Sequence, residues 1–155
     1  MILSDVCEIK RGKDFKNFSK EKTEQLQVPI MGIGGIVGYT DKCMIDRPVI
    51  AISIHGGVGK VKIYQPPCAI SDNHAYLIPD PEKVDFLYLY VYLKEFDYTR
   101  FTIKSLILNL DVQAFKKLQI PDLPPERQKI MGLKYHMRET LKILKNVMLD
   151  PMSLR

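Results

Sequence analysis

The residues of this chain that could do chemistry are spaced in ways that do not support catalysis. Its three histidines, His55, His74 and His136, lack the HxH or HxxxH spacing of a metal site. No Ser, Thr or Cys nucleophile has a visible base partner. A base-flipping methyltransferase would need an aromatic residue where Cys68 follows a proline pair. The sequence therefore predicts a binding protein with no catalytic residue, no metal and no cofactor.

Two glycine-rich segments look like nucleotide-binding loops but miss the residues that such loops require. A GxGxxG fingerprint beginning at Gly32 needs a glycine where Val37 stands. A phosphate-binding P-loop over residues 54–61 needs glycine at Ile54 and Ser or Thr at Val61. Nucleotide binding is therefore not expected.

Charge is distributed unevenly along the 155 residues, which carry 23 basic and 18 acidic groups and a net charge of +5. Residues 1–63 carry 10 basic and 7 acidic groups, residues 64–98 carry 2 and 6, and residues 99–155 carry 11 and 5. A polyanion binder could fold the two basic flanks onto one face and leave the acidic segment behind. A scatter of solvated charges is the alternative that composition leaves open.

The overall composition is that of an ordinary folded domain. Hydrophobic residues make up 46% and charged residues 26%, which excludes disordered and low-complexity classes. No apolar run approaches the roughly 20 residues of a membrane span, and the first residues do not form a signal peptide. Three cysteines without CxxC spacing form neither a disulfide framework nor a zinc site. We expect a cytoplasmic protein with no membrane association.

The elements that must position any binding residues can be traced from hydrophobic periodicity. Strands are expected at residues 49–54, 60–64 and 75–78, and helices at 84–96 and 126–149, while residues 28–31 form a short apolar run. Residues 49–54 and 60–64 form a hairpin around a glycine loop, while Leu3–Arg11 fits a strand or a short helix leading into one. Residues 105–118 stay ambiguous, and Asp150-Pro151 ends the last helix.

The last helix carries an apolar seam. Ile130, Met137 and Leu144 are spaced by seven residues, and Leu141 and Met148 form a second set with the same spacing. Two interpretations remain open. The helix packs on its own domain, or it pairs with a helix of another chain or domain.

Several segments of the chain, taken in order, match one known family. They are the opening Leu3-x-x-Val6-x-x-Ile9-x-x-Gly12, then residues 28–30, 34–42, 50–61, 70–78 and 86–90, and the run from Leu118 to Ile130. Together they resemble the target recognition domain of type I restriction–modification specificity subunits, over nearly the whole chain. Each motif alone is loose, but the set in this order is specific.

The resemblance implies an α+β fold, with a twisted mixed or antiparallel sheet domain over residues 1–124 and a spacer or dimerisation helix over residues 125–155. It implies no chemistry of its own. Double-stranded DNA would be bound, and modification (methyltransferase) and restriction subunits would be recruited. A cytoplasmic location in a prokaryote, or in a cell infected by a virus that encodes the protein, follows from the same resemblance.

The family's full subunit carries two recognition domains and two such helices, so this chain resembles half a subunit. A homodimer through the last helix would read two identical, inverted half-sites. Its contacts would be the seam residues Ile130, Met137, Leu141, Leu144 and Met148.

This chain also departs from the family pattern. Ile54-His55 stand where the family usually has Arg or Lys, and the stretch after Thr102 is more apolar than usual. A second hypothesis is therefore a protein-interaction module in which DNA reading is vestigial, acting as a decoy or regulator of restriction–modification machinery.

DNA contacts are expected from basic and polar residues beside the glycine loop and in the flanks. The expected phosphate contacts are Lys13, Lys16, Lys60 and Lys104, with the backbone amides of Gly57 and Gly59. The expected base contacts are Ser53, His55, Asn73, His74 and Arg100. A turn-capping role for Asn73 and a surface position for His74 are the alternatives.

Overall fold

A four-stranded antiparallel sheet forms the centre of the protein, in a computed structural model that describes residues 1–149. Its strand order is β1 (Cys7–Arg11), β7 (His74–Pro79), β4 (Val49–Ser53) and β5 (Val61–Tyr64). The predicted hairpin of residues 49–54 and 60–64 is confirmed, because β4 and β5 pair directly. The strand β7, which comes later in the chain, inserts between β1 and β4.

Both faces of this sheet are covered, which is why every residue of β4 is buried. Ile50, Ile52 and Leu77 lie in one hydrophobic cluster with the helices. Val49 and Tyr76 lie in a second cluster on the opposite face. Successive side chains along each strand thus point alternately into two hydrophobic cores, one on each face of the sheet.

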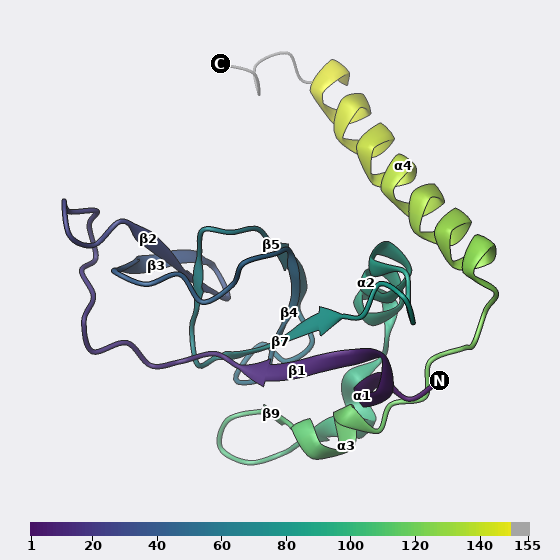
Figure 1. The fold of residues 1–155 in the computed structure, drawn as a ribbon, viewed down its shortest axis with the longest axis horizontal. Helices are drawn as coiled ribbons and strands as arrows, with labels where there is room; N and C mark the ends of the chain where they lie inside the picture. The colour runs from purple at the N-terminus through teal and green to yellow at the C-terminus, as the bar shows by residue number, and fades with distance from the viewer. Residues whose placement is uncertain (150–155) are drawn as a thin grey trace.

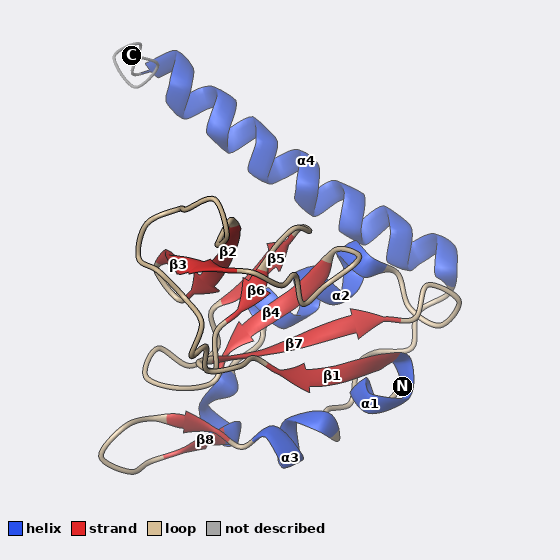
Figure 2. Cartoon of the chain, turned by 60° about the vertical axis from the view of Figure 1, so that its left-hand side comes forward, coloured by secondary structure: helices blue, strands red, loops and turns tan. Residues whose placement is uncertain are grey.

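A smaller sheet covers the second face. It consists of β2 (Val28–Gly32), which pairs antiparallel with β3 (Gly35–Thr40) and parallel with β6 (Ala69–Ile70). Met31 of β2 and Ile70 of β6 belong to the second cluster. Figure 2 shows β2 and β3 to the left of β4 and β5.

Short helices cover the first face. They are α1 (Leu3–Val6), α2 (Phe86–Glu95), the 3-10 helix η1 (Tyr98–Phe101) and α3 (Val112–Lys116). Asp85, Asp97 and Asp111 begin three of these helices, and each side chain accepts a hydrogen bond from a backbone N–H of the first turn. The expected helix of residues 84–96 is confirmed as α2. Of the two interpretations of Leu3–Arg11, the structure has the short helix (α1) that leads into a strand (β1).

The segment of residues 105–118, which the sequence left ambiguous, contains the second strand of a small hairpin and α3. The hairpin strands are β8 (Thr102–Ile103) and β9 (Asn109–Leu110), two residues each. The tip between them is apolar and exposed at Leu106, Ile107 and Leu108. Strands this short show no periodicity, so the pattern of the sequence could not reveal them.

The helix α4 (Pro125–Leu149) leaves the domain after an extended linker and projects beyond it (Figure 1). It begins one residue before the predicted Glu126, and its predicted end at Asp150-Pro151 lies outside the described residues. The α+β class, with mixed and antiparallel sheets and a long last helix, is as predicted. None of the helices described between residues 1 and 149 is long and apolar enough to cross a membrane.

Candidate nucleic-acid interface

One end of the central sheet gathers most of the residues predicted to contact DNA. β1 and β4 finish at this end, and β5 and β7 start there. The register pairs Arg11 with Ala75 and Ser53 with His74. Three segments far apart in the sequence therefore meet: the lysine-rich loop after β1 (residues 12–27), the glycine loop after β4 (residues 54–60) and the turn before β7 (residues 71–73).

The buried Ser53 side chain stabilises the glycine loop by two hydrogen bonds. Its Oγ accepts a hydrogen bond from the Lys60 N–H at 2.9 Å and donates one to the carbonyl of Gly57. Gly59 has φ +85°, and a Cβ at this position would stand 2.6 Å from the Tyr98 ring, so only glycine fits without strain. The loop is therefore held in one conformation between Ser53 and Tyr98.

Two predictions about this loop need correction. The Ser53 side chain is fully buried, so it supports the loop and cannot reach a base edge. The Gly59 N–H donates to the Ser53 carbonyl at 3.0 Å, so it is not available to a phosphate. Gly57 and Lys60 are exposed at the loop surface, and their predicted roles stay open.

His74 is also misassigned as a base contact or as a surface residue, because only 3% of it is exposed. Its Nδ1 lies 3.2 Å from the Ser71 hydroxyl, and its ring meets Tyr64 edge to face. Burial, with a smaller contribution from Lys62, lowers the pKa of His74 to about 4. The neighbouring Asn73 remains exposed.

His55 joins two segments at the sheet end. Its Nε2 lies 3.3 Å from a guanidinium nitrogen of Arg11, and its Nδ1 is hydrogen-bonded to Oδ1 of Asn109. Because arginine can only donate, Nε2 accepts, and the proton of the neutral ring sits on Nδ1 and points to Asn109. Both ring nitrogens are thus occupied within the protein.

Arg11 and Asn109 were not predicted as site residues. They lie 44 and 54 residues from His55 in the sequence. Their meeting depends on the insertion of β7 between β1 and β4 and on the pairing of His55 with Asn109 across a β-bridge. The only signal in the sequence was the position of Arg11 at the end of an expected strand, next to the lysine-rich loop.

A groove of about 700 Å³ runs beside Arg11. Residues 10–17 line one side and residues 40–44 the other, so Lys13 and Lys16 face the same hollow as Arg11. Both lysines are exposed. Two carboxylates, Asp14 and Asp41, also line the groove, so its charge is predominantly but not wholly basic.

Three of the other predicted contacts line a second hollow of about 530 Å³ beside the glycine loop. Lys104, Gly57 and Gly59 line it together. Arg100 is exposed on the neighbouring η1 and is not part of its lining. The acidic residues Asp80 and Glu82 follow the far end of β7, away from this interface, whereas Asp72 lies in the turn before β7 and Asp97 lines the second hollow.

The long helix α4 is fixed to the domain by its polar and small residues. Gln128 is buried, accepts a hydrogen bond from the Asp85 N–H at 2.9 Å and donates one to the Leu123 carbonyl at 2.7 Å. Lys94 lies 5.5 Å from the ring centroids of both Tyr90 and Tyr135. Hydrogen bonding to Tyr135, and then to Tyr90, raises the pKa of Lys94 to about 12.

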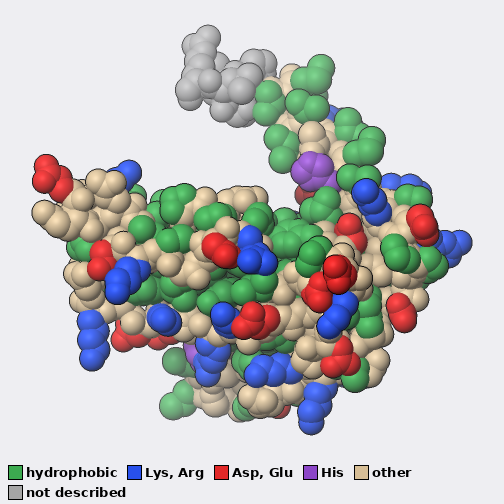
Figure 3. All heavy atoms as spheres, viewed as in Figure 1, with side chains coloured by type: hydrophobic (Ala, Val, Ile, Leu, Met, Phe, Trp, Pro, Cys, Tyr) green, Lys and Arg blue, Asp and Glu red, His purple; other side chains and the backbone are tan. Residues whose placement is uncertain are grey.

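The predicted seam lies on the opposite side of α4. With 3.6 residues per turn, the inner residues Gln128, Gly132 and Tyr135 share one stripe, and the seam lies about 180° away from it. The seam residues Ile130, Met137, Leu141, Leu144 and Met148 are all more than half exposed. Figure 3 shows hydrophobic side chains along the length of this helix.

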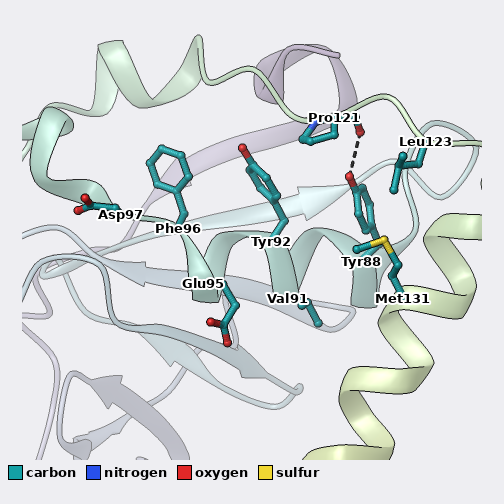
Figure 4. A pocket seen from close by; sticks show the side chains of 9 residues that line it. All are labelled: Tyr88, Val91, Tyr92, Glu95, Phe96, Asp97, Pro121, Leu123 and Met131. Carbon is teal, nitrogen blue, oxygen red and sulfur yellow. Dashed lines mark hydrogen bonds between the residues drawn. The ribbon is translucent and has the colours of Figure 1, made fainter.

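An apolar hollow of about 410 Å³ lies where α4 joins the domain (Figure 4). One side is lined by Tyr88 and Tyr92 of α2 and by Phe96, the residue that follows α2. Met131 approaches from α4. The Tyr88 hydroxyl donates to the Pro121 carbonyl at 2.9 Å across it. Its lining contains carboxylates but no basic residue, so it does not suit a phosphate.

The described part of the chain offers no metal centre. Within residues 1–149, no three His, Cys, Asp or Glu side chains come together in a way that could hold a metal ion. Burial raises the pKa of Cys7 to about 12 and that of Cys68 to about 11. These two thiols therefore stay protonated near neutral pH, where they are weak nucleophiles.

The fold and this site define a class of protein: a small α+β domain with a basic, loop-built end and a projecting helix. The chain belongs to the type I restriction modification DNA specificity domain family, whose model matches residues 1–147. No curated protein matches the sequence.

Solved structures of specificity subunits share the fold. The S subunit of a type I restriction-modification system from M. genitalium superposes with a TM-score of 0.73 at 18% identity, over 95% of this chain and 40% of that one. A chain from a structure describing the assembly and conformational transition of the type I R-M system gives 0.73 at 17% identity, with the same coverage. The HsdS subunit from Thermoanaerobacter tengcongensis superposes with a TM-score of 0.65 at 18% identity, over 95% of this chain and 39% of that one. This chain therefore spans about two fifths of the length of each of these chains.

Proposed function

We propose that this chain is a sequence-specific DNA-binding module of a type I restriction–modification system, with no chemistry of its own. It would bind one half of a double-stranded target and present it to modification and restriction subunits, which would methylate or cleave. Membership of the DNA specificity family supports this assignment. The matched region corresponds to about two fifths of a specificity subunit, and we propose that this region contacts one half of the target.

One observation carries the proposal. Segments distant in the sequence converge at one end of the central sheet, where Arg11, Lys13 and Lys16 line one open hollow and Lys104 of the β8–β9 hairpin lines another. Basic side chains on exposed loops that surround a groove are the arrangement by which proteins hold the phosphates of a duplex while other groups approach the bases.

The test is selection of bound sequences from a randomised duplex library, followed by titration of the enriched duplex across a range of salt concentrations. The proposal expects an enriched motif and an affinity that falls steeply as salt rises, because bound cations are released from the phosphates. Binding without an enriched motif, or without salt dependence, would contradict it.

Pairing of two chains through α4 is the second part of the proposal. The inner stripe already binds the domain through Gln128 and Gly132, and the seam on the outer side has no partner among the described residues. A seven-residue apolar spacing over most of the helix is typical of a helix pair. Because α4 docks on its domain through Gln128 and Gly132, a symmetric pair would set the distance between two half-sites.

An alternative candidate is a protein-interaction module in which DNA reading is vestigial. The observation that favours it is the amount of exposed apolar surface on α4, together with the apolar hollow at its base. This candidate predicts stable association through Leu141, Leu144 and Met148 and no retention of DNA. The library selection described above separates the two.

A further inference from the structure

The guanidinium of Arg11 is held at the end of β1 by a neutral partner. Its Nη2 lies 3.3 Å from Nε2 of His55. Among residues 1–149, no carboxylate forms an ion pair with it. The positive charge of Arg11 is therefore not neutralised within the domain, and the side chain lines the open groove of residues 10–17 and 40–44.

The partner of Arg11 is itself held in place. Nδ1 of His55 is hydrogen-bonded to Oδ1 of Asn109, which fixes the tautomer in which Nε2 accepts from Arg11. Nδ2 of Asn109 donates to the Ile107 carbonyl at 3.0 Å and to the Ser105 hydroxyl at 3.3 Å. The orientation of the guanidinium thus depends on a chain of hydrogen bonds that ends in the β8–β9 hairpin.

A fixed orientation distinguishes Arg11 from its lysine neighbours. A phosphate contact needs positive charge but little fixed geometry, and Lys13 and Lys16 supply such charge on the same groove. A planar guanidinium held from one side presents its other N–H groups as a pair. The base edge that offers two acceptors at a matching spacing is that of guanine, through O6 and N7 in the major groove.

We propose that Arg11 reads a guanine of the DNA target, with His55 and Asn109 as positioning residues. This inference rests on the proposed DNA-binding function and adds to it the base that is read and the residue that reads it. His55, expected from sequence to contact a base itself, then acts through Arg11.

The experiment compares libraries of randomised duplex DNA selected by the wild-type chain, Arg11→Ala and Arg11→Lys. The wild type should enrich a motif with guanine at one fixed position. Arg11→Ala should lose the preference at that position and keep the others, with discrimination falling roughly 5- to 150-fold. Arg11→Lys keeps the charge but not the paired donors, so it should bind more tightly than Arg11→Ala without restoring the preference.

A modified base gives an independent measurement. The enriched duplex is prepared with 7-deazaguanine at that position, which removes the N7 acceptor. Wild-type affinity should fall severalfold on this duplex, whereas Arg11→Ala should bind both duplexes equally. As the matched control, Lys16→Ala should weaken binding to every duplex by a similar factor and still discriminate 7-deazaguanine from guanine.

The positioning role has its own readout. His55→Ala should broaden the preference at the guanine position, while His55→Gln, whose side-chain oxygen can accept from Arg11, should restore part of it. Circular dichroism and thermal unfolding of each variant show whether the fold is retained. A merely structural role for His55 would lower stability in both variants without changing the selected motif.

The outcomes separate the two levels of the proposal. A wild-type selection without any enriched motif overturns the DNA-reading function and the inference with it. An enriched motif that keeps its guanine in the Arg11→Ala selection, or that contains no guanine dependent on Arg11, overturns the inference and leaves the function standing.

Discussion

Gly132 of α4 lies directly against Leu87 of α2. A Cβ at position 132 would stand 2.7 Å from Cβ of Leu87 and 3.0 Å from the backbone nitrogen of Tyr88. Contacts this short with another helix cannot be relieved by rotating a side chain. The absence of a side chain at this one position therefore allows the long helix to approach the domain closely.

Replacing Gly132 by alanine should therefore destabilise the protein, although alanine favours helix by about 1 kcal/mol. We expect the free energy of unfolding to fall by about 1–3 kcal/mol, the usual cost of overpacking. Urea denaturation followed by circular dichroism measures it. Gly34→Ala is the matched control, because a Cβ there meets nothing within 4 Å. A more stable Gly132→Ala variant would show that α4 does not dock as described.

Leu144 tests the seam of α4. Its side chain is 52% exposed in the single chain, so Leu144→Asp should leave the domain's stability nearly unchanged. If two copies pair through the seam, a carboxylate buried there should weaken the dimer by tenfold or more. Light scattering across a concentration series measures the change. Ile143→Asp is the control, because Ile143 is exposed to a similar extent but lies to the side of the seam. A wild-type chain that stays monomeric at high concentration would contradict helix pairing.

The parts of the fold that repeat a pattern could be predicted, and β4 is the clearest example. Its β-branched run is bounded by a glycine loop, so the strand and its hairpin partner follow from local residues alone. The helix α4 is similarly evident from its periodicity and the Pro124-Pro125 break. The two-residue strands β8 and β9 contain too few residues for any period, so their hairpin could not be predicted.

The site was predictable in its region but not in its individual contacts. The glycine loop and the turn before β7 were expected to lie at the interface, and they do meet. His74 looks like an exposed polar residue at the start of a strand. It is buried because both faces of the central sheet are covered, which a single strand's sequence does not reveal. The pairing of Arg11 with His55 depends on strand order, which is a property of the whole chain.

Lys13 and Lys16 should contribute to affinity without contributing to sequence preference. Each lines the basic groove on an exposed loop, where a lysine acts as a point charge. For each lysine that contacts a phosphate, replacement by alanine should reduce the slope of log K against log salt by about 0.9. Titrations at four or five salt concentrations measure the slope. Lys129→Ala, on the exposed surface of α4, is the control. An unchanged slope in both loop variants would place the DNA elsewhere.

The buried His74 predicts how stability depends on pH. Burial lowers its pKa in the folded chain to about 4, while an unfolded histidine has a pKa near its ordinary 6.5. Between these two values the unfolded chain binds more protons than the folded chain. The free energy of unfolding is therefore highest above pH 6.5 and falls as pH decreases toward 4, by roughly 2–4 kcal/mol from this residue alone.

Urea denaturation at intervals from pH 4 to pH 8 measures this dependence, and a His74 variant isolates it from the carboxylates that titrate in the lower part of the window. Glutamine at position 74 can still meet the Ser71 hydroxyl but has no proton to gain, so the His74→Gln protein should lose less stability between pH 6.5 and pH 5 than the wild type. His136→Gln should follow the wild-type curve, because His136 is exposed on α4. If the wild-type and His74→Gln curves run parallel through this interval, His74 titrates in the folded chain much as it does in the unfolded one. That result would mean that the turn before β7 opens to water, and it would return His74 to the residues that DNA could reach.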